Sequence, residues 1–273
     1  MTRTRIIRRE HIPFVEIGRT DYVLQTFPEY LTGQIADLGA GPAARHFRPH
    51  LGDRYTAIDR HTWGDTDLQI DFEKLPLPFE DNAFDTVLCM DTLEHVDNPD
   101  QLLEECTRIT RRYVIISLPN NWSGFLWKLL VGGAPNPKRY ANVAYGLPPQ
   151  PELELEGRRH KWFFNTENAV HFLTENARRL DMNVVDLRCV LDKSTSSIFY
   201  CYPYPDILGI SLRRVREKRP HLLVPFILIK YGFAVPFSWI EEIFKQAIWG
   251  WGGEFRYMNL FCRGIWIVLE KQR

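Results

Sequence analysis

A glycine-rich turn directly after a short apolar run is the feature that most constrains the fold of this chain. The apolar run spans residues 35–38, and Gly39-Ala40-Gly41 follows it at once. Glycine adopts backbone conformations that other residues disfavour, and without a Cβ it lets a ligand come close to the main chain. In an open α/β sheet, ligands bind beyond the carboxyl ends of the strands. The turn therefore predicts a parallel α/β domain with a ligand site at the end of its first strand.

Apolar runs and helical patterns alternate along the chain after this turn, as a parallel α/β sheet requires. A short helix is expected between the turn and Gly52, and a longer one over residues 166–180. The best-marked helix starts after Asn98, a favourable cap, with Pro99 in its first position and Gln101 where a capping box places an amide. The predicted strands cover residues 35–38, 55–58, 68–70, 84–90, 113–118, 182–191 and 257–269. The predicted fold class is α/β, a Rossmann-like sheet of seven strands flanked by helices.

The overall composition is that of a soluble globular protein. The 273 residues are 45% hydrophobic and 25% charged, which is ordinary for such proteins and sufficient for a core without cross-links. The formal net charge is +0 at pH 7, so the composition does not favour nucleic acid as a partner. The cysteines are scattered and odd in number, and the basic N-terminus carries no apolar signal segment. Both features predict a cytoplasmic protein.

The chain is expected to have three parts. These are an N-terminal extension over residues 1–33, the α/β domain over 34–191 and 256–273, and an apolar helical insertion over 192–255. In the insertion, a basic patch at 213–219 precedes an apolar run with prolines and tryptophans. One interpretation is a lid or a helix pair packed on the sheet. Another is peripheral docking on a membrane through residues 209–251, because basic residues and tryptophans flank interfacial anchors; a dimer interface and a membrane-spanning segment are further alternatives.

Two kinds of ligand would suit the glycine turn. Gly39, Gly41 and Ala44 also satisfy the dinucleotide-binding pattern, and Asp59 lies where that fold keeps an acid for the ribose. However, Asp37 ends the first strand. A carboxylate there would repel a pyrophosphate, whereas it would attract the cationic amino end of S-adenosylmethionine. This acid therefore favours S-adenosylmethionine over a nicotinamide dinucleotide.

Later features of the sequence agree with that choice. Asp71 ends the third strand with Phe72 beside it, which suits a hydrogen bond to an adenine amine and an apolar contact with its ring. Leu-Pro-Leu-Pro-Phe at 75–79 then leads into Phe-Asp-Thr-Val at 84–87, and Leu-Glu-His-Val follows at 93–96. In this order, starting from the Asp-x-Gly-x-Gly turn, the motifs resemble those of the class I S-adenosylmethionine-dependent methyltransferases.

The resemblance covers residues 37–119 and implies a methyltransferase sheet with the large helical insertion before its last strand. The predicted cofactor-binding residues are Asp37, Gly39, Ala40, Gly41, Asp59, Asp71, Phe72 and Met90. By the resemblance, the two glycines lie near the methionine moiety of the donor, Asp59 binds the ribose hydroxyls, and the Asp-Phe pair contacts the adenine. Ala43 stands where many members of the family have a third glycine, which crowds the turn slightly.

A second group of polar residues follows the fourth strand, where the methyl acceptor is expected. Asp91, Glu94 and His95 lie within one turn, and His160 comes later, just before a helix. This Asp-x-x-Glu-His with a later histidine is similar to the Glu-x-x-Glu-His plus His arrangement of metal-dependent O-methyltransferases, which include the small-RNA 2′-O-methyltransferases and the ubiquinone-pathway enzymes. The resemblance implies that Asp91, Glu94, His95 and His160 hold Mg²⁺ or Mn²⁺, which would lower the pKa of a bound hydroxyl.

The same residues allow an interpretation without metal. Asp91 is one methylene shorter than the glutamate of that arrangement, and many metal-free methyltransferases also carry Leu-Glu-His-Val at this place. Glu94 and His95 would then only order the loop before the next helix. The candidate catalytic residues are His95, His160 and Asp91, with either histidine as the general base. Asn120, Asn121 and Trp122 follow the fifth strand and are candidates for the acceptor pocket.

Together these features predict O-methylation of a hydroxyl on a small-molecule, lipid or glycan acceptor. A noncatalytic S-adenosylmethionine-binding protein would carry the same donor site, but its cofactor would never turn over. An RNA 2′-O-methyltransferase is a further alternative. The basic patch at 213–219 allows it, whereas the zero net charge does not encourage it.

Overall fold

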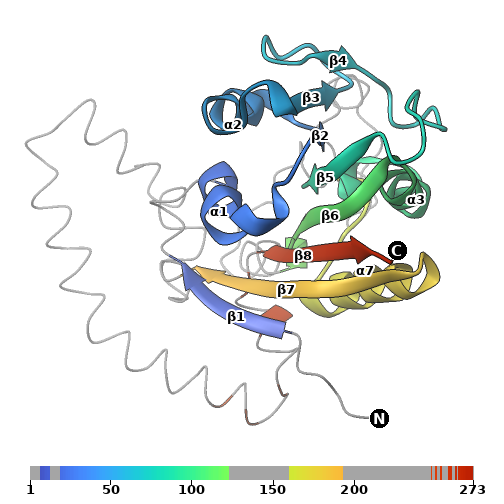
Figure 1. Ribbon diagram of the computed structural model, residues 1–273. Helices are drawn as coiled ribbons and strands as arrows, with labels where there is room; N and C mark the ends of the chain where they lie inside the picture. The colour runs from blue at the N-terminus through green and yellow to red at the C-terminus, as the bar shows by residue number, and fades with distance from the viewer. Residues whose placement is uncertain are drawn as a thin grey trace, which may run out of the picture.

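The computed structural model describes residues 7–12, 19–122, 160–192 and 264–272, together with residues 247, 250, 253, 258, 259 and 262. Within this part of the chain, eight strands form one sheet in the order β1-β7-β8-β6-β5-β2-β3-β4 (Figure 1). The strands are β1 (Ile7–Ile12), β2 (Ile35–Leu38), β3 (Tyr55–Asp59), β4 (Leu68–Gln69), β5 (Phe84–Met90), β6 (Thr110–Pro119), β7 (Met182–Asp192) and β8 (Gly264–Lys271). The helices are α1 (Arg19–Thr26), α2 (Ala44–Leu51), α3 (Pro99–Ile109) and α7 (Thr166–Arg179), with 3-10 helices η1 (Pro28–Tyr30), η2 (Gly41–Ala43), η3 (Gly52–Arg54) and η4 (Leu93–His95).

The sheet is parallel except at β8, which runs antiparallel to both β6 and β7. β2 lies in the parallel part, between β3 and β5, and β5 pairs in turn with β6. The carboxyl ends of these four strands therefore meet at one edge, where open α/β sheets bind their ligands. This topology confirms the predicted Rossmann-like sheet of seven strands, with β1 as an additional strand beside β7.

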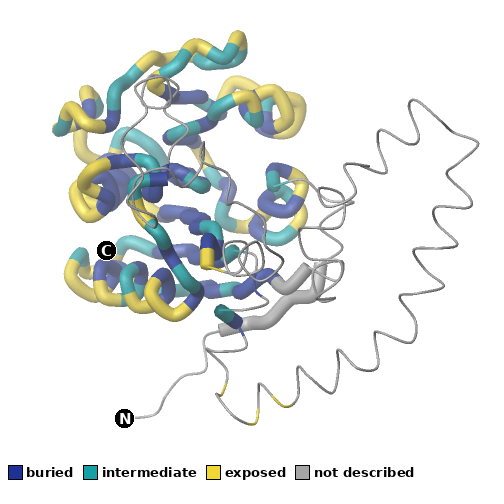
Figure 2. Tube along the Cα trace, turned by 180° about the vertical axis from the view of Figure 1, so that it is seen from behind, coloured by how far each residue is buried: buried dark blue, intermediate teal, exposed yellow. Residues whose placement is uncertain are grey.

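Helices cover both faces of the sheet. α1 and α2 pack on one face, where their apolar side chains form one buried cluster with Ile35, Leu88 and Ile115. α3 and α7 pack on the other face, in a second cluster that includes Leu38 and Val87. Successive residues of a central strand thus belong to opposite clusters, as expected for parallel strands buried on both faces. Figure 2 shows the buried strands between helices whose outer sides are exposed.

Most predicted elements are confirmed, with differences at their ends. β2 and β5 have the predicted bounds. β8 starts at Gly264 rather than at residue 257, since Met258 and Asn259 are helical. α3 begins at Pro99 as predicted, but the expected capping bond of Asn98 is absent. The ψ angle of Asn98 is 79°, below the extended range of a typical N-cap, so its side chain is not directed at the first amides of the helix.

The expected N-terminal extension contributes two elements to the domain. β1 pairs in parallel with β7, and α1 packs on the sheet. The β1 sequence, Ile-Arg-Arg-Glu-His-Ile, is mostly charged and lacks the apolar pattern by which the other strands were predicted. The beginning of the chain therefore completes both the sheet and one helical layer.

The predicted insertion at 192–255 lies largely outside the described residues. Of the insertion, Asp192 forms the end of β7, and Ala247, Gly250 and Gly253 are helical. Among the helices of the described residues, none is long and apolar enough to cross a membrane.

Candidate active site

The glycine turn is packed tightly against the end of β5. Gly39 has a φ of +79°, and a Cβ added to it would lie 2.2 Å from Oγ1 of Thr92. The Thr92 hydroxyl lies 3.0 Å from the carbonyl oxygen of Leu38 and 3.1 Å from that of Met90, close enough to donate to either. Both the backbone conformation and the available space therefore require glycine at this position.

Asp59 is fixed beside the same turn. Its two carboxylate oxygens accept hydrogen bonds from the backbone amides of Gly41, at 3.0 Å, and of His61, at 2.9 Å. Its side chain is largely buried. Each carboxylate oxygen retains a second lone pair, so the carboxylate is oriented and still able to accept hydrogen bonds from a pair of hydroxyls.

Asp37 lies beneath the turn, almost completely buried. The hydroxyl of Tyr55 donates a hydrogen bond of 2.5 Å to Oδ2 of Asp37. Burial raises the pKa of the Asp37 carboxyl to about 6, although the bond from Tyr55 and the charge of Arg19 lower it. Near neutral pH this carboxyl is therefore ionised, and it places a buried negative charge next to the glycine turn.

The three apolar residues among the predicted cofactor contacts, apart from the glycines, are also buried. Ala40 and Met90 are 1% exposed and Phe72 is 7% exposed. All three belong to the core clusters. Their side chains therefore pack in the core and leave little surface for a ligand. Asp71, in contrast, is partly exposed, and its Oδ1 accepts a hydrogen bond of 3.3 Å from the amide of Glu73.

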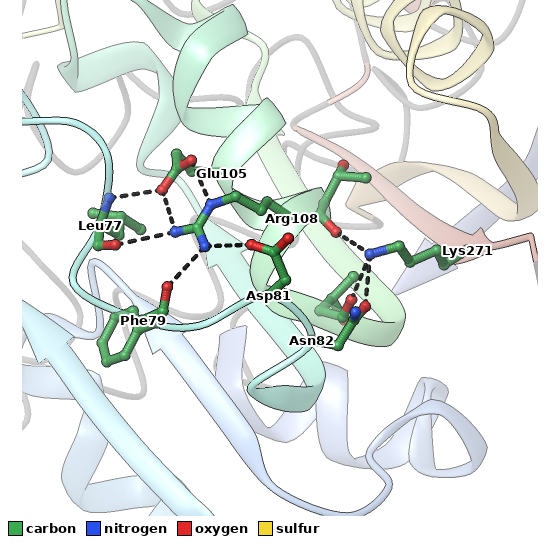
Figure 3. Close-up of polar contacts among 9 residues, drawn as sticks. Leu77, Phe79, Asp81, Asn82, Glu105, Arg108 and Lys271 are labelled. Carbon is green, nitrogen blue, oxygen red and sulfur yellow. Dashed lines mark hydrogen bonds and ion pairs between the residues drawn. The ribbon is translucent and has the colours of Figure 1, made fainter.

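The proline-rich segment at 75–79 is held by α3 (Figure 3). Arg108 donates to the carbonyl oxygens of Leu77, at 3.0 Å, and Phe79, at 2.7 Å. It also forms ion pairs of 2.8 Å with Glu105 and with Asp81. Glu105 in turn accepts a bond of 2.7 Å from the amide of Leu77. This network fixes the loop that leads away from the Asp71–Phe72 pair.

Asp91 does not join the other predicted metal ligands. Its Oδ1 accepts a bond of 2.7 Å from the Ser117 hydroxyl, and its Oδ2 lies 3.0 Å from Nη1 of Arg19. Its φ is +48°, a left-handed turn that aspartate tolerates better than most residues. Ser117 and Arg19 engage the Asp91 carboxylate, and the ligand group found among the described residues consists of Glu94, His95 and His160 without it. A role for Asp91 as a fourth ligand stays a prediction.

Arg19, the first residue of α1, was not predicted as a site residue. Burial lowers the pKa of its guanidinium, but the carboxylates of Asp91 and Asp37 outweigh this effect, so that the pKa is raised overall. Arg19 therefore brings a permanent positive charge to the carboxyl edge of the sheet. A single arginine in a polar extension has no spacing that would indicate this role.

Glu94, His95 and His160 do converge. Their potential ligand atoms all lie within 4.8 Å of one another. Glu94 is fully buried, and its Oε1 is 3.9 Å from Nε2 of His95. The two imidazole rings meet edge to face, with centroids 4.7 Å apart. We refer to these three residues as the His-Glu group.

Asn121 orients the histidine that comes from the later segment. Oδ1 of Asn121 lies 3.1 Å from Nδ1 of His160. With the carboxamide oxygen as acceptor, Nδ1 carries the proton, and Nε2 is left with the lone pair. Nε2 is therefore the His160 atom able to bind a metal ion or to accept a proton.

Comparison with known proteins identifies the domain. Residues 36–117 match the family model described as a methyltransferase domain. The chain carries a class I, S-adenosylmethionine-dependent methyltransferase domain. No curated protein matches the sequence significantly.

Solved structures similar to this methyltransferase share little sequence with it. An S-adenosylmethionine-dependent methyltransferase from Archaeoglobus fulgidus is 14% identical, with 92% of both chains covered and a TM-score of 0.49. The cyclase SpnF is 16% identical, over 92% of this chain and 79% of SpnF, with a TM-score of 0.47. Phosphoethanolamine N-methyltransferase 2 of Haemonchus contortus, solved with S-adenosyl-L-methionine, is 17% identical over 93% of this chain and 52% of its own, with a TM-score of 0.45.

The matched segment contains the glycine turn, Asp59 and Asp71 as well as two members of the His-Glu group. It does not contain Arg19, Asn121 or His160. The predicted cofactor-binding residues therefore all lie within the matched segment, whereas Arg19, Asn121 and His160 lie outside it.

Proposed function

We propose that the protein transfers a methyl group from S-adenosylmethionine to a hydroxyl oxygen of a small-molecule, lipid or glycan acceptor. The observation that carries this proposal is the convergence of the His-Glu group at the edge of the sheet where β5 ends. A hydroxyl must lose its proton as the methyl group arrives, and such a group can take or facilitate the loss of that proton. The displacement is in line, so the acceptor oxygen must lie opposite the sulfur of the donor.

The donor is proposed to bind along the carboxyl edge, from the glycine turn to Asp71. Gly39 and Gly41 keep the main chain accessible, and Asp59 would accept hydrogen bonds from the ribose hydroxyls. Asp71 would accept one from the adenine amine. The buried charge of Asp37 would attract the ammonium group at the methionine end, because a charge in a low-dielectric interior acts over several ångströms.

The His-Glu group also fits a divalent metal ion. One carboxylate and two imidazoles form a donor set that suits Mn²⁺ better than Mg²⁺, which prefers oxygen ligands. We therefore propose Mn²⁺ as the ion of this site. The chemistry it would supply is a lower pKa of the acceptor hydroxyl. Where no metal is bound, Nε2 of His160 would accept the proton.

Binding of S-adenosylhomocysteine, measured by calorimetry with the full chain, tests the donor site. We expect one site, which Asp59→Ala weakens strongly. Asp67→Ala is a control, because Asp67 is also at the β3–β4 side but pairs with Arg48, at 2.6 Å. Absence of binding to the wild-type protein would refute the proposed function.

Methyl transfer is tested with methyl-labelled donor and three acceptor pools: catechols, isoprenoid quinols and oligosaccharides. The expected product carries the label on oxygen, and His160→Asn reduces its formation at least 100-fold, the scale of a lost proton-transfer group. His171→Asn is the matched control, since His171 is exposed on α7. Label found only on amines, or only on the 2′-oxygen of RNA, would refute the proposed acceptor class. Donor binding with no S-adenosylhomocysteine released in any pool would indicate a noncatalytic binder.

The metal is tested separately. Calorimetric titration of Mn²⁺ should show binding that His160→Asn abolishes and His171→Asn preserves. If the wild-type protein binds no Mn²⁺ and its activity is unchanged in EDTA, the metal is rejected and His160 remains as the base.

The insertion bears on which acceptor class is used. Its basic and tryptophan-rich run at 209–251 supports a lipid acceptor if it docks on membranes, and a small molecule or glycan if it is a lid. Co-sedimentation of the full chain with anionic liposomes distinguishes these two proposals.

A further inference from the structure

Lys161, the residue after His160, joins three separate loops at the carboxyl edge of the sheet. Its Nζ lies 2.6 Å from Oε1 of Glu73, in the loop after β4, and 2.8 Å from Oδ1 of Asp97, in the loop after β5. The backbone amide of Asp97 closes the network by donating to the Glu73 carboxylate, at 3.1 Å. One lysine thus connects the segment that carries His160 with two other loops.

The backbone of the Lys161 segment is pinned to the rest of the His-Glu group. The amides of Lys161 and Trp162 both donate to the carbonyl oxygen of Glu94, at 2.7 and 3.2 Å. The indole of Trp162 donates to the carbonyl oxygen of Val96, at 2.9 Å. A displacement of this segment would therefore move His160 relative to Glu94.

The same network reaches the candidate adenine site. The amide of Glu73 donates to Oδ1 of Asp71, so the acid proposed to bind the adenine lies two residues from a partner of Lys161. The connection runs from Asp71 through Glu73 and Lys161 to His160, and each of its steps is a covalent neighbour, a hydrogen bond or an ion pair. Such a contiguous set of contacts can transmit an ordering effect between two sites.

We propose that Lys161 is a positioning residue that couples donor occupancy at the adenine site to the alignment of His160 in the His-Glu group. This inference rests on the proposed function, because it takes the donor to bind at Asp71. Ordering of the Asp71–Glu73 loop by the donor restrains Lys161, and through it the histidine next to Lys161. By linkage, a restrained His160 segment in turn strengthens donor binding.

The surroundings of Lys161 distinguish it from an ordinary surface lysine. Its side chain is 26% exposed and that of Glu73 is 25% exposed. Its Nζ makes two short ion pairs, of 2.6 Å to Glu73 and 2.8 Å to Asp97. Lys74, in the same loop as Glu73, offers a contrast: its side chain is 84% exposed and lies 3.9 Å from Asp71.

The test uses the full chain as wild type, Lys161→Met, Lys161→Arg and the control Lys74→Met. Two quantities are measured: the dissociation constant for S-adenosylhomocysteine and the change in the His160 ring NMR signal on saturation with this ligand. The signal is assigned with His160→Asn. In the wild type we expect the ligand to shift the His160 signal. In Lys161→Met the shift should disappear and the dissociation constant should rise about 3- to 10-fold, the scale for a partly exposed charge network.

Two variants separate coupling from a merely structural role. Lys161→Arg keeps the charge and should restore most of the response, and Lys74→Met should behave as wild type. Glu73→Gln removes the other end of the ion pair and should reproduce Lys161→Met, which keeps the test available if that variant does not fold.

The outcomes also distinguish this proposal from the proposed function. If the wild type binds S-adenosylhomocysteine but its His160 signal does not respond, or if Lys161→Met and Glu73→Gln respond as fully as the wild type, the coupling is refuted and the function stands. If the wild type does not bind the ligand, both fail.

Discussion

Replacement of Asp37 by asparagine should stabilise the ligand-free protein above pH 6 and weaken donor binding. Burial raises the pKa of the folded carboxyl from 3.8 to about 6. Well below the unfolded pKa of 3.8, the carboxyl is protonated in the folded and unfolded chains alike, so it does not change the unfolding free energy. As the pH rises towards and through 6, the folded protein must ionise a buried group that the unfolded chain ionises more easily. This difference in pKa lowers the unfolding free energy by about 3 kcal/mol, and the full decrease is reached by neutral pH.

Asparagine at this position cannot ionise, and its carboxamide oxygen can still accept the bond from Tyr55. The unfolding free energy of Asp37→Asn should therefore be within about 1 kcal/mol of wild type at pH 4 and about 2–3 kcal/mol higher at pH 7.5. Urea denaturation followed by tryptophan fluorescence at both pH values measures this. The reasoning fails if the two proteins differ by the same amount at both pH values.

Asp85→Asn is a control of opposite sign. The Asp85 carboxylate accepts bonds from the amide of Gln34, at 2.8 Å, and from Arg111, at 2.6 Å. Burial raises the pKa of Asp85, but these two partners outweigh it and lower the pKa overall. The ionised Asp85 carboxylate stabilises the folded protein above the unfolded pKa, and this stabilisation is lost as the pH falls. Asp85→Asn should therefore destabilise the protein at pH 7.5 more than at pH 4.

The same substitution at Asp37 should impair function. If the ionised carboxylate attracts the ammonium group of the donor, its loss should weaken S-adenosylhomocysteine binding about 10-fold at pH 7.5, corresponding to about 1.4 kcal/mol. Wild-type affinity should rise between pH 5 and 7, whereas that of Asp37→Asn should stay flat. A variant that is more stable and binds the donor as well as wild type would show that Asp37 does not act on the donor.

Three further substitutions test the framework of the site. Gly39→Ala combines a positive φ with a steric clash, whereas Gly64→Ala has a φ of +80° and nothing within 4 Å of the added Cβ. Calorimetry should show that only Gly39→Ala loses donor binding. In urea denaturation, Gly39→Ala should lower the unfolding free energy by at least about 1 kcal/mol more than Gly64→Ala does. Arg108→Met removes the network of Figure 3 and should lower the unfolding free energy by about 3 kcal/mol, against at most about 1 kcal/mol for Arg111→Met on a 59% exposed side chain; equal losses would contradict the role of the network. Arg19→Met removes a cation beside the buried carboxyl of the glycine turn, so it should lower the unfolding free energy at pH 7.5 more than at pH 4, and equal losses at both pH values would count against this interaction.

The central strands could be predicted because local chemistry bounds them. β2 ends at Leu38, directly before Gly39, and β5 ends at Met90, directly before Asp91, where the backbone turns to positive φ. β1 could not be predicted in this way, since its pairing with β7 joins residues about 180 positions apart, such as Ile7 and Leu187. Its sequence resembles a polar tail, and only the neighbouring strand makes it part of the sheet.

In the candidate site, too, some contacts could be predicted from the sequence and others depend on distant residues. The convergence of His95 and His160 was expected from the resemblance to metal-dependent enzymes, and the structure brings them together. The fate of Asp91 was not, because it depends on Arg19, 72 residues away, and on Ser117, 26 residues away. Spacing within a motif indicates which side chains are near one another, but it does not show which distant residue binds one of them first.

Asn120 indicates how the acceptor side is assembled. Its Nδ2 lies 2.7 Å from the carbonyl oxygen of Cys262 and 2.9 Å from that of Asn259, just before β8. The neighbouring Asn121 contacts His160. Residues 120–121 therefore join His160 of the His-Glu group to the described residues before β8. Since the predicted cofactor-binding residues all lie in the segment that the family model matches, we propose that residues 123–159 and 193–257 select among acceptors. Changes confined to them should alter which acceptor is methylated and leave S-adenosylhomocysteine affinity unchanged.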